Sequence, residues 1–185
     1  ISPTRKGETG TVNLNRVLQA ALNPPAPAKK EKFCGEICFR EGDRVMQIRN
    51  NYDILWKKAD GSAGTGVYNG DIGLIASIDT KEDRLLLRFD DREAWYEAEQ
   101  LGELELAYAV TAHKSQGSEY RAVIFVPFAG TPRLLTRGVL YTAITRAREL
   151  LVLVGNEQIV AQMVENNRRD KRYSGLRLRL MGDSQ

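Results

Sequence analysis

The sequence predicts a mixed α/β protein in which a parallel sheet flanked by helices is interrupted by a small β-barrel. From residue 104 onward, short apolar runs alternate with segments of helical period, which is typical of a parallel sheet covered by helices. From residue 35 to residue 103, short strand-like runs are separated by turn signals such as Asn69-Gly70, a spacing typical of a small barrel. The chain has 185 residues, 42% of them hydrophobic, so it can bury the core of one domain that carries a smaller second one.

These patterns divide the chain into three parts. Residues 1–34 are predicted to form the first part of the α/β domain and a connector. Residues 35–103 are predicted to form the inserted barrel, and residues 104–185 the remainder of the α/β domain.

A helix is predicted over Val12–Leu22, with Thr11 or Asn13 as its N-cap. Asn15 and Gln19 share one flank of it, so they could face a groove together. We expect its apolar face to pack against a sheet. The apolar residues at helical spacing are Leu14, Val17, Leu18 and Ala21.

Composition narrows the class of protein. A net charge of +3 and a pI near 8.9 allow a nucleic-acid partner without requiring one. The chain has only two cysteines, Cys34 and Cys38, and one histidine, so the residues for a tetrahedral zinc site are missing and we expect no metal site. It has no run of about 18 apolar residues and no signal-peptide pattern, so we expect a soluble, cytoplasmic protein with no membrane contact. The first residue is Ile1 rather than Met, and we expect a part of a longer protein.

A polar link, Thr111–Glu119, lies between two apolar segments, Leu104–Val110 and Val123–Val126, that are predicted to be buried strands. The link should therefore follow the carboxyl end of a strand, where open sheets of this kind bind their ligands. It offers many hydrogen-bond donors, the cation Lys114, and a glycine, Gly117, that lets the backbone approach a ligand. This chemistry suits an anionic partner, although an ordinary surface loop has a similar composition.

A second polar element is a helix predicted over Arg137–Glu149. Arg146 and Arg148 lie on opposite flanks of its apolar arc, about 160° apart, so only one of them can point into a given cleft. The planar donor fork of arginine suits phosphate oxygens, but a surface arginine is also commonly solvated or paired with a nearby acid such as Glu149. The apolar arc consists of Leu140, Ala143, Ile144 and Ala147.

The C-terminal end continues the α/β pattern. A strand is predicted over Leu150–Val154, and Asn156 is predicted to cap the helix that follows. The basic segment Arg168–Arg179 is either a solvated helix end or a contact with a phosphate backbone.

Four blocks of the sequence, in order along the chain, resemble one family. The link Thr111–Glu119 resembles motif V of superfamily 1 helicases, most closely the RecD/TraA-type DNA helicases, and residues 140–148 resemble motif VI. Residues 42–52 and 67–73 resemble the small barrel that this family inserts before motif V. The resemblance implies a RecA-like domain of the P-loop-NTPase type, the second motor domain of the family, interrupted by an SH3-like β-barrel.

The same resemblance implies an ATP-dependent DNA helicase that translocates on single-stranded DNA, from 5′ to 3′, and unwinds duplex DNA in recombination and repair. It makes Arg146 the catalytic arginine finger, Gln116 and Gly117 sensors of the γ-phosphate, and Glu119 the acceptor for the ribose. The residues that it places along the DNA backbone are Thr111, His113, Lys114 and Ser115.

Two parts of such an enzyme are absent from the sequence. It contains no G-x-x-x-x-G-K-[ST], the loop that cradles phosphates, and hence no acidic pair that acts with such a loop to hold magnesium. We therefore expect ATP and Mg²⁺ to bind mainly to an N-terminal RecA-like domain outside this sequence, and the chain alone to be inactive.

Two alternatives stay open. The chain could be the helicase portion of a conjugative relaxase or of the α subunit of an exodeoxyribonuclease V complex. It could also be a non-enzymatic module whose barrel binds a protein or a nucleic acid.

Overall fold

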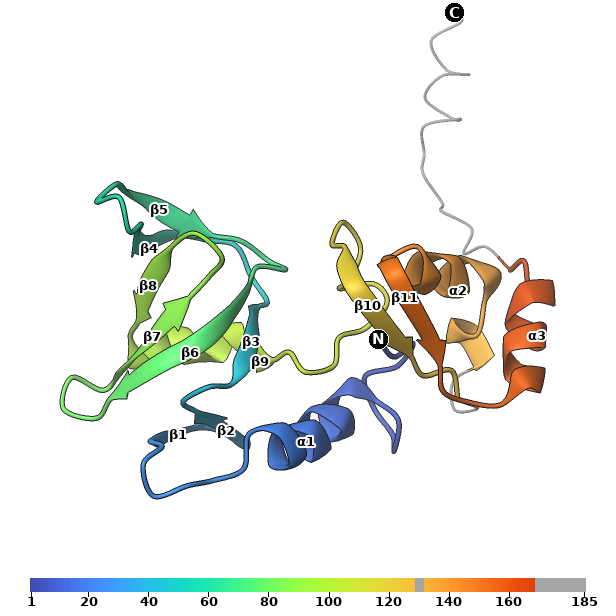
Figure 1. The fold of residues 1–185 in the computed structure, drawn as a ribbon, viewed down its shortest axis with the longest axis horizontal. Helices are drawn as coiled ribbons and strands as arrows, with labels where there is room; N and C mark the ends of the chain where they lie inside the picture. Colours follow the sequence, from blue (N-terminus) through green and yellow to red (C-terminus); the bar gives the residue numbers. More distant parts are fainter. Residues whose placement is uncertain (129–131, 169–185) are drawn as a thin grey trace, which may run out of the picture.

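The computed structural model describes residues 1–128 and 132–168, which form two packed parts (Figure 1). A curled antiparallel sheet lies on the left of this view, and the parallel strands β10 (Tyr120–Phe125) and β11 (Ala147–Leu153) lie on the right with helices beside them. Helix α1 (Thr11–Leu22) lies below and between the two parts. This arrangement confirms the predicted mixed α/β fold. None of the helices in the described ranges is long and apolar enough to cross a lipid bilayer.

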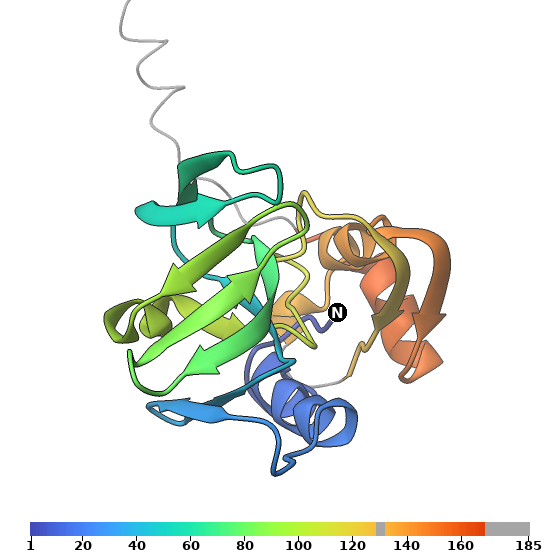
Figure 2. The same cartoon turned by 60° about the vertical axis from the view of Figure 1, so that its left-hand side comes forward.

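The antiparallel sheet has seven strands in the order β5-β4-β8-β7-β6-β3-β9 and curls into a half-barrel (Figure 2). β5 and β9 lie at its two edges, so over the described residues the barrel is open rather than closed. A separate two-stranded hairpin, β1–β2, and a 3-10 helix, η1, complete this part. The bounds are β1 (Glu31–Cys34), β2 (Ile37–Arg40), β3 (Arg44–Gln47), β4 (Asn51–Lys57), β5 (Ala63–Val67), β6 (Ile72–Asp79), β7 (Arg84–Arg88), β8 (Glu93–Tyr96), η1 (Ala98–Glu103) and β9 (Leu104–Leu106).

Successive side chains of each strand point to opposite faces of the half-barrel, and one of these faces is buried. In β7, Leu85 and Leu87 are fully buried, while Arg84 and Arg88 lie on the other face. The guanidinium of Arg84 lies 4.4 Å from the ring centroid of Trp95 on β8, so it covers part of that half-exposed ring. The core of the half-barrel consists of Phe39, Val45, Ile54, Val67, Ile75, Ile78, Leu85, Leu87, Phe89, Ala94, Tyr96, Leu101 and Leu104.

The parallel pair β10–β11 packs with helices α2 (Arg137–Ile144) and α3 (Glu157–Glu165), and a short 3-10 helix, η2 (Pro132–Leu134), precedes α2. Asn156 caps α3 as predicted, because its side chain accepts a hydrogen bond of 2.8 Å from the backbone N–H of Gln158. The buried residues of this part form a second core that consists of Ala112, Val123, Phe125, Leu135, Val139, Leu140, Ala143 and Met163.

The first residues of the chain run beside β10. The amino group of Ile1 donates to the carbonyl of Ile124 at 2.6 Å, and the Ile1 carbonyl accepts from Val126 N at 3.0 Å. Ser2 forms an isolated parallel bridge with Thr111. The start of the polar link is therefore held next to the parallel pair by residues more than a hundred positions away in sequence.

The apolar segment before the link is not one strand of the parallel sheet, and that prediction is wrong. Strand β9 covers only Leu104–Leu106 and pairs antiparallel with β3 of the half-barrel. Beyond it, Ala107 N donates to the carbonyl of Arg44 at 2.8 Å. The backbone N–H of Ala109 then donates to the Asn15 side chain of α1 at 2.7 Å. A short apolar run suits a strand of either sheet, so the pattern alone does not distinguish them.

Helix α1 forms as predicted, but its buried face is polar. Asn15 and Gln19 are buried, so the prediction that the apolar face packs against a sheet is wrong. The helix instead contacts backbone carbonyls and N–H groups, which need side-chain donors and acceptors rather than apolar contacts. Its N-cap is Gly10, without a side-chain bond, rather than Thr11 or Asn13. Its most exposed apolar residues are Val12 at 59%, Val17 at 46% and Leu22 at 68%.

Asp43 is a buried carboxylate at which three parts of the chain meet. They are α1, the half-barrel, and the return segment, residues 107–110, which leads from β9 to the polar link. Asp43 is fully buried, and it accepts hydrogen bonds from the side-chain amides of Gln19 at 2.6 Å and Asn23 at 2.7 Å. It also accepts from the backbone N–H of Arg40 at 2.7 Å and from the hydroxyl of Tyr108 at 2.8 Å. Burial, together with the bond to Asp43, raises the pKa of the Tyr108 hydroxyl above its ordinary value. One side chain thus joins segments from three regions of the chain.

Replacing Asp43 should destabilise the fold strongly. Asp43→Ala leaves several buried donors without an acceptor, and we expect it to lower the free energy of unfolding by about 3 kcal/mol. Tyr108→Phe removes a single donor and should cost about 1 kcal/mol. Urea unfolding measures both, with Asp53→Ala at an exposed position as the control. If the urea concentration at the unfolding midpoint were the same for Asp43→Ala and Asp53→Ala, the central role of Asp43 would be contradicted.

Candidate functional site

The polar link folds as a series of tight turns rather than as an open loop. Ser115 N donates to the carbonyl of Thr111 at 3.0 Å, and Ser118 N donates to the carbonyl of Ser115 at 3.1 Å. Gly117 lies between these turns with a φ of 89°, a left-handed conformation that favours glycine. The space beside this glycine is open, because a Cβ there would meet nothing within 4 Å. Gly117 is therefore required for the backbone conformation and leaves the surface open to a ligand.

The link divides its side chains between the surface and the interior. His113 and Gln116 are exposed, as a ligand-binding role requires. Ser115 is fully buried, and its hydroxyl donates to the carbonyl of Ala112 at 2.8 Å. In this conformation the Ser115 hydroxyl faces the interior, and its predicted contact with a DNA backbone stays a prediction. Thr111 is half-buried, and its hydroxyl oxygen accepts the backbone N–H of Lys114 at 3.2 Å.

Lys114 is paired with an acid. Its ammonium lies 2.7 Å from a carboxylate oxygen of Glu105, and the other oxygen of Glu105 lies 2.6 Å from the guanidinium of Arg5. These side chains retain access to solvent, so such pairs contribute little and can exchange partners. Lys114 and Arg5 thus form a small cationic surface whose charge Glu105 partly neutralises.

The helix predicted over residues 137–149 ends at Ile144, so the prediction for its second half is wrong. Thr145 N still donates to the carbonyl of Tyr141 at 3.1 Å, but Arg146 N donates to the carbonyl of Ala143 at 3.3 Å, three residues back, so the last turn tightens and the helix ends. The chain then enters β11, which pairs with β10. Arg146 follows the helix and Arg148 lies in the strand, so the helical projection that separated them does not apply.

Both arginines meet the end of the polar link. The guanidinium of Arg146 donates to the carbonyl of Ser118 at 2.9 Å, and the carbonyl of Arg146 accepts from Tyr120 N at 2.8 Å. Arg148 forms an ion pair with Glu119, with its Nε 2.6 Å from the carboxylate. The structure therefore brings the predicted residues Arg146 and Glu119 together in space.

Arg146 keeps donor capacity after these contacts. Besides the bond to Ser118, its Nε donates to the carbonyl of Thr142 at 3.1 Å and an NH2 nitrogen donates to the hydroxyl of Thr145 at 3.2 Å. Bonds within the described residues thus use three of the five guanidinium N–H groups. Glu149, which the sequence suggested as a partner, instead pairs with Arg121 at 3.0 Å, and this hydrogen bond raises the pKa of Arg121.

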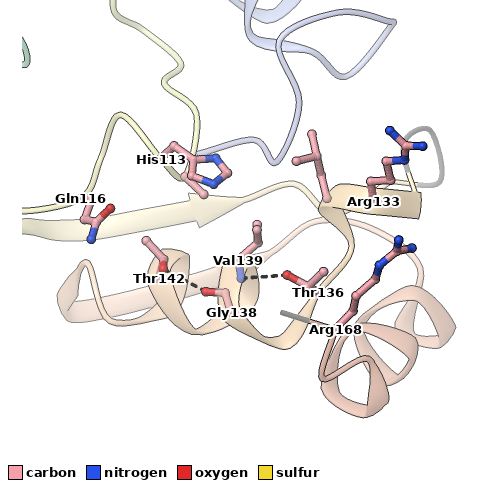
Figure 3. A pocket seen from close by; sticks show the side chains of 10 residues that line it. His113, Gln116, Arg133, Thr136, Gly138, Val139, Thr142 and Arg168 are labelled. Carbon is pink, nitrogen blue, oxygen red and sulfur yellow. Dashed lines mark hydrogen bonds between the residues drawn. The ribbon is translucent and has the colours of Figure 1, made fainter. Parts of the chain in front are cut away.

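A cavity of about 840 Å³ lies between the link and helix α2. Figure 3 shows His113 and Gln116 across this opening from Thr142 and Gly138 of α2. At one end of the view lie two exposed arginines. Together with the amide of Gln116 and the hydroxyl of Thr142, their positive charges suit a ligand that carries oxyanions. These arginines are Arg133 and Arg168.

Sequence reasoning missed Arg133, because a single arginine between a proline and two leucines carries no motif. Arg168 belongs to the basic segment that was predicted to be solvated or bound to phosphate, and the rest of that segment lies outside the described residues. Over those described residues, no group of three His, Cys, Asp or Glu side chains could hold a metal ion.

Comparison with known families identifies both parts of the chain. Residues 14–89 match the family model described as the ATP-dependent RecD-like DNA helicase SH3 domain, and residues 106–154 match the UvrD-like helicase C-terminal domain. The chain belongs to the RecD-like helicases. This confirms the resemblance inferred from the four sequence blocks and the identity of the half-barrel as an SH3-like domain.

Relatives of this RecD-like chain are longer proteins. It is 32% identical over 156 residues to the ATP-dependent RecD2 DNA helicase of Deinococcus radiodurans, and the match covers 84% of the chain and 20% of that relative. It is 34% identical over 176 residues to the RecBCD enzyme subunit RecD of Mycobacterium tuberculosis, with 95% of the chain and 27% of the relative covered. The chain thus spans about a quarter or less of the length of these two relatives.

Solved structures agree with the fold of the RecD-like chain. A Bacteroides Pif1 helicase in complex with ADP-AlF3 and single-stranded DNA has a TM-score of 0.51 at 18% identity, covering 99% of the chain and 48% of that protein. A structure of two coordinating Pif1 helicases at forked DNA has a TM-score of 0.52 at 19% identity, covering 95% and 43%. At such identities the comparison supports the fold alone.

Proposed function

We propose that the chain is the second RecA-like motor domain of an ATP-dependent DNA helicase, interrupted by its SH3-like barrel. The parent protein would translocate on single-stranded DNA from 5′ to 3′ and unwind duplexes in recombination and repair. We assign residues 1–34 to the motor domain and its connector, as predicted from the sequence. We move the second boundary from residue 103 to residue 106, because β9 pairs with β3 of the half-barrel, so residues 35–106 form the barrel and residues 107–185 return to the motor domain. The observation that supports this most is the junction at which Arg146 bonds to Ser118, because it joins motif V to motif VI.

The nucleotide roles follow from that junction. Arg146 is the proposed arginine finger, whose delocalised charge would stabilise a transferring phosphoryl group. Gln116 and Gly117 would sense the γ-phosphate through the exposed turn that they form. Glu119 would accept a hydrogen bond from the ribose, since its exposed ion pair with Arg148 can exchange at little cost. ATP and Mg²⁺ would be held mainly by an N-terminal RecA-like domain of the same protein, which would supply the phosphate loop.

The strand-contacting roles belong to the exposed cations and hydroxyls near the link. Thr111, His113 and Lys114 would lie along the DNA backbone, as the family resemblance suggests. We add Arg133 and Arg168, because they line the same cavity as His113. Contacts of this kind recognise phosphates rather than bases, so binding would depend little on sequence.

A second candidate function is a role as part of the α subunit of an exodeoxyribonuclease V complex. The relatives named RecBCD enzyme subunit RecD, one of them 34% identical over 95% of the chain, favour this possibility. The helicase portion of a conjugative relaxase and a non-enzymatic binding module remain further alternatives. In each case we propose a cytoplasmic location.

The chain by itself should not hydrolyse ATP. A finger residue without a bound triphosphate has nothing to stabilise, and the phosphate loop is not in this sequence. We expect phosphate release by the purified chain, with saturating ATP, Mg²⁺ and single-stranded DNA, to equal the background without protein. Turnover at the rate of a helicase would contradict the proposed division of the site between two domains.

In the full-length parent, Arg146→Ala should lower the hydrolysis rate by about a thousandfold or more, as for other arginine fingers. Arg148→Ala should have a much smaller effect, because it removes only an exposed ion pair. Single-turnover hydrolysis at saturating ATP and DNA measures both.

Arg146→Lys separates the finger from a structural role, because it keeps a cation but loses the planar fork. We expect Arg146→Lys to remain folded by circular dichroism and to be nearly as slow as Arg146→Ala. DNA affinity should survive all three changes. A fast Arg146→Ala enzyme together with an inactive Arg148→Ala enzyme would reverse the assignment.

Single-stranded DNA should bind to the chain weakly, with affinity that falls as salt rises. Removing one phosphate contact by Arg133→Ala or Arg168→Ala should reduce the slope of log affinity against log salt by about 0.7 for each contact. Fluorescence anisotropy across a salt series measures this slope. Arg121→Ala, which removes an 84% exposed side chain on β10, is the matched control and should leave it unchanged. Equal slopes for all variants would exclude Arg133 and Arg168 from the strand path.

A further inference from the structure

Two tyrosine rings stand together on the surface of the half-barrel. Tyr52 lies in β4 and is 63% exposed, and Tyr68 follows β5 and is 45% exposed. Their ring centroids are 5.9 Å apart and the ring planes meet at 74°, an edge-to-face pair. In such a pair the edge of one ring covers only one face of the other, and the exposed fractions show that part of each ring is open to solvent. The pair is thus an exposed aromatic surface without a role in the core.

The turn that carries Tyr68 is held rigidly. The backbone N–H of Asp71 donates to the carbonyl of Tyr68 at 3.0 Å, and the carboxylate of Asp71 accepts the N–H of Tyr68 at the same distance. The same carboxylate pairs with Arg92 at 2.8 Å, which ties the turn to the sheet. Gly70 completes the turn with a φ of 102°. A ring mounted on such a turn loses little freedom when it binds a ligand.

The turn and strand β4 are also joined to each other. The backbone N–H of Asn69 donates to the side chain of Asn50 at 2.9 Å, and the amide of Asn50 lies 3.4 Å from the hydroxyl of Tyr52. Both asparagines and the neighbouring Arg49 are exposed. The two rings therefore lie beside exposed amide groups, a setting that suits nucleotides better than an apolar partner.

This surface lies next to the junction of motifs V and VI. Gly70, Asp71 and Arg92 line a cavity of about 390 Å³ together with Ser118 and Glu119 of the polar link. The turn that presents Tyr68 is thus in the wall of a space shared by the barrel and the motor domain. The barrel turn therefore lies beside the end of the same link whose first residues are proposed to contact the strand.

We propose that Tyr52 and Tyr68 form a base-stacking platform for single-stranded nucleic acid. Every base has a face that can stack on an aromatic ring, so the platform would accept any sequence. It would add base contacts to the phosphate contacts of the link. This inference rests on the proposed function, because it requires that a single strand bind to the chain.

The test compares oligothymidine with an abasic strand of the same length, which has the phosphates but no bases. For the wild-type chain, anisotropy should give tighter binding to oligothymidine than to the abasic strand. Tyr52→Ala and Tyr68→Ala together should weaken oligothymidine binding by about fivefold to a hundredfold, the effect expected of one lost stacked base. Abasic binding should stay the same. Tyr52→Phe with Tyr68→Phe keeps the rings and should behave as the wild type.

Phe33→Ala is the matched control, because it removes a 66% exposed ring from β1, and it should change neither affinity. Equal affinities of the wild type for the two strands, or an alanine variant that keeps the wild-type ratio, would overturn the platform and leave the proposed function in place. The second result would favour a protein contact for these rings. Failure of the wild type to bind either strand would overturn the strand-binding proposal itself, and the platform with it.

Discussion

The fully buried carboxylate of Asp43 is the constraint on which the arrangement of the two parts depends. It accepts hydrogen bonds from α1 through Gln19, from the segment after α1 through Asn23, and from the return segment through Tyr108. A buried carboxylate is costly unless its oxygens are satisfied, so these segments must be in place together. The chain leaves the α/β part, builds the half-barrel and returns past the same side chain.

Side-chain amides perform the same task along α1. The Asn15 side chain donates to the carbonyls of Leu106 and Ala109 and accepts the N–H of Ala109. It thus provides the hydrogen bonds that a neighbouring strand would otherwise provide to the backbone of residues 106–109. A buried backbone needs such partners wherever it leaves a sheet. The polar face of α1 thus fixes the path of the chain just before motif V. The position of the link, and with it the candidate site, depends on this helix.

The candidate site is assembled from two segments that are close in space because β10 and β11 pair in parallel. That pairing places Tyr120 beside Ala147 and so brings the end of the link to the arginines that follow α2. Arg146 bonds to Ser118, and Arg148 pairs with Glu119. If a nucleotide binds to the link as proposed, a change in the link would reach Arg146 through its bond to Ser118. It would also reach the barrel turn around Asp71, which lines a cavity together with Glu119. The geometry thus connects the link, Arg146 and the barrel over a short distance.

The sequence by itself determined the class of fold, because strand period and turn signals are local properties. The resemblance of its motif residues to a known family pointed to the family and made Gln116, Gly117, Glu119 and Arg146 candidates. Only the tertiary structure decided that Leu104–Leu106 joins the half-barrel, that α1 buries amides, and that the helix before Arg146 stops at Ile144. It also buried Ser115 and brought Arg133 to the cavity beside His113. Each of these depends on partners distant in sequence, and an apolar run or a polar side chain is compatible with several environments until those partners are in place.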